Sequence, residues 1–236
     1  HKLVPAGIDL SQIEGKIVAV DDEQENKDKL DENKLIVCLD AGHGGKDNGS
    51  DYRLRYEKND NLKITQAVAA YLADKENIQV IMTRSDDTFL SLEERTSFAN
   101  QNNADYFVSL HRNTGEGNGV ETWIRSDADD KAQALAQNIM DNLDAAGISR
   151  NRGVKKGTQK SESKDYYVNL HTNMPACIVE LGFMNSPTDN QLFDANVENY
   201  AKAIGDAVLK TYESYGKDGA DAKESVEDVP GTEEQT

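Results

Sequence analysis

The chain has 236 residues, 37% of them hydrophobic and 29% charged, which is enough apolar material for one sizeable folded domain. Its apolar runs, such as Leu35–Leu39 and Cys177–Val179, are too short to cross a bilayer, so no transmembrane segment is expected. The formal net charge is −17 and lysines and arginines form no cluster, which argues against nucleic-acid binding.

Acidic residues are concentrated at the two ends. Residues 1–33 hold nine acids and four lysines, and residues 217–236 hold seven acids and two lysines. The beginning lacks both an initiator Met and the apolar segment of a signal peptide, so we expect an export signal or anchor to be missing from this chain. We predict a polar linker or stalk over 1–33, a folded domain over 34–215 and a disordered acidic tail over 216–236.

Between these ends, strand and helix patterns alternate. Runs of β-branched, aromatic and other apolar residues predict five strands: Lys34–Asp40, Ile78–Thr83, Tyr106–Leu110, Val120–Ile124 and Cys177–Leu181. A period near 3.6 predicts helices over Asn61–Leu72, Asp130–Leu143 and Val197–Tyr212, and Ser186-Pro187 is typical of a helix start. The pattern predicts an α/β fold: a single domain with a twisted, mostly parallel sheet flanked by helices on both faces.

The two cysteines, Cys38 and Cys177, both lie in apolar strand-like runs. Buried free thiols are the favoured interpretation, because nothing in the sequence places the two within disulfide distance.

Two histidines stand where predicted strands end. His43 follows the strand ending near Asp40, within a glycine-rich turn, and His111 directly follows Leu110. Ligands of open α/β sheets bind at the carboxyl ends of strands, so both imidazoles point toward one crevice. Two histidines and a glutamate form a known catalytic zinc set, and Glu57 is the best candidate for the third ligand. Taken singly, a histidine at a strand end is more often a structural hydrogen-bonding residue than a metal ligand.

Glu180 places a carboxylate inside an apolar run, between Val179 and Leu181. Burying an unpaired carboxylate is costly. A metal site, a catalytic role or a buried salt bridge to an arginine would each explain it, and the local pattern does not choose among them.

Several motifs follow one another in an order that decides between these alternatives. They are Asp40-Ala-Gly-His43-Gly-Gly45, Tyr56-Glu57-Lys58-Asn59, Thr83-Arg84 with Asp87, Leu92 and Arg95 after it, Ser109-Leu-His111-Arg-Asn113, and Val179-Glu180-Leu-Gly-Phe-Met-Asn185. Over residues 34–213 the chain resembles the zinc-dependent N-acetylmuramoyl-L-alanine amidase family, the amidase 3 type of bacterial cell-wall hydrolases.

The resemblance implies hydrolysis of the amide between N-acetylmuramic acid and L-alanine in peptidoglycan. It implies one Zn²⁺ per chain, held by His43, Glu57 and His111, with Glu180 as the catalytic glutamate. We hypothesise that Glu180 acts as general base toward the attacking water and then protonates the departing amine. A monomer acting outside the cytoplasm, with peptidoglycan as its partner, is expected.

Three further residues are predicted as substrate contacts. Arg112 and Asn113 adjoin His111, although a surface charge and a turn residue would explain them as well. His171 lies before the last predicted strand and could equally be a loop residue. The connections Thr114–Gly119 and Ser126–Asp129 are too short for the blocking helical insertion that some relatives carry, so an open cleft is predicted.

Two rival functions remain open at this point. A zinc peptidase or deacetylase would use the same ligands on another amide. A wall-binding module with a degenerate site would lack a ligand, whereas all four expected residues are present.

Overall fold

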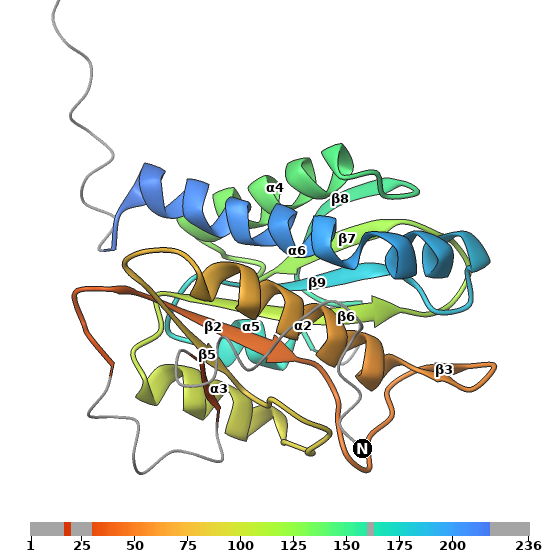
Figure 1. Ribbon diagram of the computed structural model, residues 1–236, viewed down its shortest axis with the longest axis horizontal. Coiled ribbons are helices and arrows are strands. Elements are labelled where there is room, and N and C mark those ends of the chain that lie inside the picture. Colours follow the sequence, from red (N-terminus) through yellow and green to blue (C-terminus); the bar gives the residue numbers. More distant parts are fainter. Residues whose placement is uncertain (1–16, 20–29, 160–162, 218–236) are drawn as a thin grey trace, which may run out of the picture.

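The computed structural model describes residues 17–19, 30–159 and 163–217, which form a sheet covered by helices on both faces (Figure 1). The seven-stranded sheet has the order β1-β5-β2-β6-β9-β7-β8. Its strands are β1 (Ile17–Ala19), β2 (Leu35–Ala41), β5 (Ile78–Met82), β6 (Tyr106–Asn113), β7 (Val120–Ile124), β8 (Asn151–Lys156) and β9 (Ala176–Phe183). The short strands β3 (Asp51–Tyr52) and β4 (Arg55–Tyr56) form a separate antiparallel hairpin.

Five neighbouring strands of the sheet, β1, β5, β2, β6 and β9, are parallel to one another. Strand β7 pairs with β9 in the antiparallel sense and with β8 in the parallel sense. The predicted α/β class with a mostly parallel sheet is therefore confirmed.

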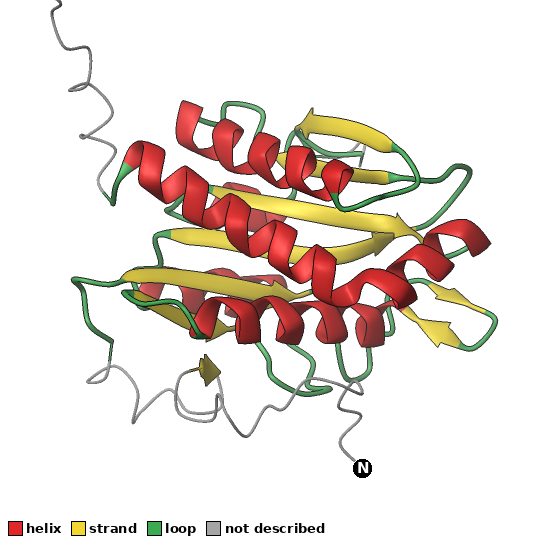
Figure 2. Cartoon of the chain, turned by 45° about the horizontal axis from the view of Figure 1, so that its top comes forward, coloured by secondary structure: helices red, strands yellow, loops and turns green. Residues whose placement is uncertain are grey.

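The helices divide between the two faces (Figure 2). On one face lie α2 (Glu57–Ala73), α4 (Asp130–Ala145) and α6 (Pro187–Tyr215), packed over alternate strand residues such as Leu35, Val37 and Leu39. On the other face, the short helices α3 (Leu92–Gln101) and α5 (Tyr167–His171) cover a smaller cluster that includes Ile36 and Cys38. No helix of the described residues is long and apolar enough to cross a membrane.

Local sequence signals define where helices begin. Ser91 caps α3 by accepting a hydrogen bond from the backbone of Glu94, whose carboxylate accepts one from the backbone of Ser91 in return. Ser186 caps α6 and Pro187 takes its first position, as the sequence predicts. One α6 residue, Asn196, has non-helical backbone angles, so the helix is kinked there.

Some elements depart from the sequence prediction. Strand β1 lies within the stretch expected to be a linker, and its backbone pairs in parallel with Val80–Met82 of β5. Residues 1–16, 20–29 and 218–236, which carry most of the predicted linker and tail, lie outside the described residues. Cys38 and Cys177 are buried free thiols on opposite faces of the sheet, which confirms that interpretation.

Candidate active site

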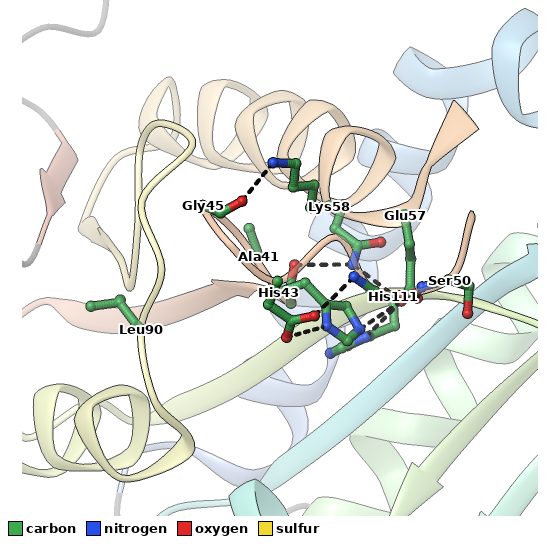
Figure 3. A network of polar contacts seen from close by, with 12 residues as sticks. Ala41, His43, Gly45, Ser50, Glu57, Lys58, Leu90 and His111 are labelled. Carbon is green, nitrogen blue, oxygen red and sulfur yellow. Dashed lines mark hydrogen bonds and ion pairs between the residues drawn. The ribbon is translucent and has the colours of Figure 1, made fainter. Parts of the chain in front are cut away.

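Three of the predicted site residues come together at the carboxyl ends of β2 and β6 (Figure 3). His43 follows β2, His111 is part of β6, and Glu57 is the first residue of α2. One potential ligand atom from each lies within 4.8 Å of the other two. The Oε1 atom of Glu57 is 2.9 Å from His111 Nδ1 and 3.3 Å from His43 Nε2. These donor atoms converge on one point, as a metal site requires.

The His43 ring is fixed by a neighbouring carboxylate. Its Nδ1 is 2.8 Å from Oδ2 of Asp47, which leaves Nε2 facing Glu57. A carboxylate on the outer nitrogen of an imidazole orients the ring and fixes its tautomer in metal sites. Burial lowers the pKa of His43, but the carboxylates of Glu57 and Asp47 outweigh that effect and raise it to about 9.

Glu57 is buried, with 3% of its surface exposed, and is held as a carboxylate. Its Oε2 accepts a hydrogen bond from the backbone N–H of Ser50 at 2.9 Å, and its Oε1 accepts one from the backbone N–H of Arg112 at 3.2 Å. Burial raises the pKa of Glu57, but its contacts with His111 and His43 lower it well below the ordinary value. A charged oxygen ligand is therefore available at this position.

Two glycines make room for the three side chains. A Cβ on Gly42 would lie 2.1 Å from the His111 ring, and a Cβ on Gly49 would lie 2.7 Å from Oε2 of Glu57. The loop itself is strained, because His43 has a positive φ of 62°. The close approach of backbone to imidazole is possible only without side chains at these two positions.

Two buried arginines hold the loop that carries His43. Arg84 donates to the carbonyl oxygens of Ala41 (2.8 Å) and Gly42 (2.9 Å). Arg95 donates to the carbonyl oxygens of Ala41 (2.7 Å) and His43 (2.8 Å). Burial, followed by the charge of Arg95, lowers the pKa of Arg84 to about 10. The motif residues Arg84 and Arg95 thus position the backbone of the site.

Glu180 is the partner of His111 in the pairing of β9 with β6. Its Oε2 is buried and has no hydrogen-bond partner among the described residues. The salt bridge to an arginine that the sequence left open is not found in this part of the chain. Burial raises the pKa of Glu180 to about 7, the charges of His43 and His111 lower it, and those of Glu57 and Glu121 raise it further. An unpartnered carboxyl beside a potential metal site is suited to proton transfer.

A further buried carboxylate, which the sequence prediction does not include, is Glu121 of β7; it is the partner of Glu180 in the pairing of β7 with β9. It is 1% exposed. Its position inside the predicted strand Val120–Ile124, as a lone acid among apolar residues, was the available signal, the same one that drew attention to Glu180.

Of the three predicted substrate contacts, the structure brings Asn113 to the neighbours of Glu180, and it places the other two elsewhere. Arg112 is 2% exposed, and its guanidinium binds Asp60, Asn190 (2.7 Å) and the carbonyl oxygen of Gly182 (3.3 Å), so it is engaged in structural contacts. Asn113 is buried and donates to Glu121 at 3.0 Å. His171 is exposed on α5, near the amino end of β9, and stacks on Tyr167.

The site is open to solvent. The side chains of His43 and His111 are 26% and 20% exposed. On this face the cluster under α3 and α5 involves Cys38, Phe107 and Ile178, earlier in β2, β6 and β9 than the site residues. No helix of the described part of the chain covers the two imidazoles, as the short connections predict.

Comparison with known proteins assigns the class. The sequence profile of the family described as N-acetylmuramoyl-L-alanine amidase matches residues 37–210. The chain is 34% identical to an N-acetylmuramoyl-L-alanine amidase of known structure from Clostridium difficile 630, with a TM-score of 0.72, covering 78% of this chain and 100% of the other. The chain therefore belongs to the N-acetylmuramoyl-L-alanine amidase family, as its motifs predict.

Two sequence relatives match about three quarters of this chain. The Bacillus subtilis protein YqiI is 36% identical over 182 residues, which are 76% of this chain and 84% of YqiI. The probable cell wall amidase LytH of Staphylococcus aureus is 33% identical over 176 residues, 73% of this chain. The match spans 55% of LytH, so LytH contains a large region that this chain does not match. Family membership makes the chain a hydrolase of the amidase class, with peptidoglycan as the family's substrate.

Proposed function

We propose that the chain cleaves the amide between N-acetylmuramic acid and L-alanine with one zinc ion held by His43, Glu57 and His111, and with Glu180 as general base. The observation that carries this proposal is the convergence of three ligand atoms within 4.8 Å, beside a glutamate oxygen that is buried without a partner.

The donor set fits zinc. Two imidazoles and one carboxylate leave a coordination position open for water or substrate, as in catalytic rather than structural zinc sites. When bound, zinc supplies Lewis acidity toward a carbonyl oxygen and lowers the pKa of water toward about 7. Asp47 orients the His43 ring for this role, and backbone N–H groups at Ser50 and Arg112 orient the Glu57 carboxylate.

Glu180 handles the proton. Its carboxylate takes a proton from the attacking water, and the resulting carboxylic acid gives that proton to the amine nitrogen as the carbon–nitrogen bond breaks. An amide nitrogen leaves poorly without this proton. The absence of an internal partner for Oε2 among the described residues supports this role, because the oxygen is not committed elsewhere.

The first test compares the wild type with Glu180→Gln on purified peptidoglycan. Glutamine keeps the size of the side chain but cannot accept the proton, so release of stem peptide should fall by about 100-fold or more. Zinc content should be unchanged, because Glu180 is not one of the three proposed ligands. Near wild-type release by the variant would exclude Glu180 as the base.

The product distinguishes this function from its rivals. An amidase releases stem peptide that begins with a free L-alanine amine, whereas a peptidase shortens the stem and a deacetylase releases acetate. We further propose that residues 34–215 form the catalytic domain, and that the protein acts outside the cytoplasm as a monomer. Mass spectrometry of the products identifies the bond that is cleaved, and light scattering of the protein tests whether it is a monomer.

A further inference from the structure

A row of polar side chains extends from the proposed metal site across the sheet. His111 of β6 is paired with Glu180 of β9, and Glu180 is paired with Glu121 of β7. Residues paired in this way project from the same face of a sheet. Arg152 of the edge strand β8 continues the row, because its Nε donates to Oε2 of Glu121 at 2.7 Å.

The third member of the row, Glu121, is held rigidly. Its Oε1 accepts hydrogen bonds from Asn113 (3.0 Å), Trp123 (3.1 Å) and Gln159 (2.9 Å), while Oε2 accepts the one from Arg152. These four donors fix the positions of both carboxylate oxygens. Glu121 therefore serves as a fixed anchor for Arg152.

Arg152 itself reaches solvent, with 27% of its side chain exposed. Its guanidinium carbon lies 5.0 Å from the ring centroid of Phe183. The hydrogen bond from Nε to Glu121 and the contact with the Phe183 ring together fix the orientation of the guanidinium. Its terminal nitrogens Nη1 and Nη2 have no hydrogen-bond partner in the part of the chain that the structure describes. The nearby loop passes close at Gly117, where a Cβ would lie 3.4 Å from Nη1, so a side chain at this position would press on the guanidinium.

We propose that Arg152 binds a carboxylate of the stem peptide, two or three residues beyond the bond that is cleaved. This inference rests on the proposed function, which places that bond beside Glu180. Neighbouring strands lie about 4.8 Å apart, so β8 is roughly 10 Å from β9, a distance that an extended peptide covers in about three residues. A preoriented guanidinium whose terminal nitrogens have no partner among the described residues matches a carboxylate in bidentate geometry.

The part of the substrate expected to bind Arg152 is the stem peptide, because it carries the negative charge. The N-acetylated sugars of the glycan carry no charge in their rings, whereas the stem peptide carries carboxylates that can also occur as carboxamides. Arg152 thus gives the cleft a direction: the glycan side lies toward His43 and β2, and the peptide side lies toward β8.

The test uses pairs of synthetic muramyl peptides that differ only by a carboxylate or a carboxamide on the second or the third residue. In Arg152→Gln, KM for the carboxylate substrates should rise roughly ten-fold or more, since hydrogen bonds between charged groups are strong. KM for the fully amidated substrate should change far less. Arg152→Lys should recover part of the preference, because it restores the charge without the bidentate geometry.

Arg150→Gln is the matched control, because it makes the same change in charge at an exposed position two residues away and should leave the preference intact. Should Arg152→Gln fail to fold because Glu121 loses its counter-charge, the double variant Glu121→Gln/Arg152→Gln removes both charges and carries the same comparison. Equal losses on carboxylate and carboxamide substrates, or no loss on either, would overturn the proposal. A wild-type protein that released no peptide from either substrate would instead contradict the proposed function, before any variant is compared.

Discussion

At the scale of single residues, the His111 ring can occupy its position only because Gly42 has no side chain. A Cβ at that position would lie 2.1 Å from both Cε1 and Nε2 of the imidazole. The carbonyl oxygen of the same glycine accepts hydrogen bonds from Arg84 and from Asn61, at 2.9 and 3.1 Å, so the backbone cannot easily move away. The added methyl group must therefore displace the ring.

We predict that Gly42→Ala weakens zinc binding by about 10- to 100-fold, which is the range seen when the surroundings of metal ligands are disturbed. Zinc titration by isothermal calorimetry measures the affinity, and circular dichroism of the metal-free protein checks that the fold is retained. A variant that binds zinc as tightly as the wild type would show that the His111 ring does not bind zinc while it packs against Gly42.

Adjacency in the sequence does not reveal the direction in which the Arg112 side chain points. Arg112 adjoins His111 in the chain, but neighbouring residues of a strand point to opposite faces of the sheet. Its guanidinium consequently reaches Asp60 of α2 on the far side, over the ring of Phe193. Adjacency in sequence was a poor guide, whereas alternation along β6 would have separated the two side chains.

At the scale of elements, helix α3 holds strand β2 through a buried ion pair. The carboxylate of Asp40, which is 1% exposed, accepts hydrogen bonds from Arg95 (2.7 Å), Thr83 (2.6 Å) and Ser109 (2.6 Å). Burial raises the pKa of Asp40, but the charge of Arg95 and these hydrogen bonds outweigh it and lower the pKa to about 2. Because Arg95 also binds the His43 carbonyl, the same pair secures the metal loop.

This pair should make stability depend on pH. The pKa of Asp40 is lower in the folded chain than the value of about 3.9 for an unfolded aspartate, so its contribution is complete above about pH 4 and is lost as the pH falls toward 2. We predict that Asp40→Asn lowers the free energy of unfolding at neutral pH by about 2 kcal/mol or more. Urea denaturation at a series of pH values should show the difference from wild type shrinking below about pH 4. A difference that stays constant with pH would contradict the assigned pKa.

Elements with strong periodicity could be predicted from sequence, and those shaped by tertiary contacts could not. The five predicted strands and the helices α2, α4 and α6 carry their own apolar patterns. Strand β8 is Asn-Arg-Gly-Val-Lys-Lys, with a single large apolar residue, and is a strand because it pairs with β7 at the edge of the sheet. Helix α3 has few apolar residues, and its capping box at Ser91 and Glu94 was the signal that could have revealed it.

The residues of the site also divide into those that local sequence predicts and those that only tertiary contacts reveal. His43, His111 and Glu180 were found because strand ends and a carboxylate in an apolar run are visible locally. The supporting residues Arg84, Arg95 and Glu121 act through contacts between segments distant in sequence, as in the 52-residue separation of Arg95 and His43. Such contacts depend on the order of strands in the sheet, which the sequence pattern does not specify. Asp47, by contrast, lies only four residues after the His43 that it orients.

At the scale of the whole molecule, the uneven covering of the sheet produces the open site. Helices α2, α4 and α6 pack on one face, while α3 and α5 lie over the region of Cys38 and Ile178 on the other. Beyond that region, the second face carries His111, Glu180, Glu121 and Arg152 across four adjacent strands. The side chains of His111 and Arg152 are partly exposed there, and Glu121 is buried between its neighbours. A polymer with a neutral glycan and a charged peptide arm can therefore lie across the strands without a lid having to open.

Metal analysis tests most directly whether His43, Glu57 and His111 hold one catalytic zinc ion. The wild type and Glu57→Gln should each be loaded with zinc, dialysed and measured by mass spectrometry for zinc per chain. We predict one zinc in the wild type and far less in Glu57→Gln, with release of stem peptide lost on chelation and regained on adding zinc. A wild type that holds no zinc, or a Glu57→Gln variant that keeps one zinc per chain, would show that these residues are not the zinc ligands.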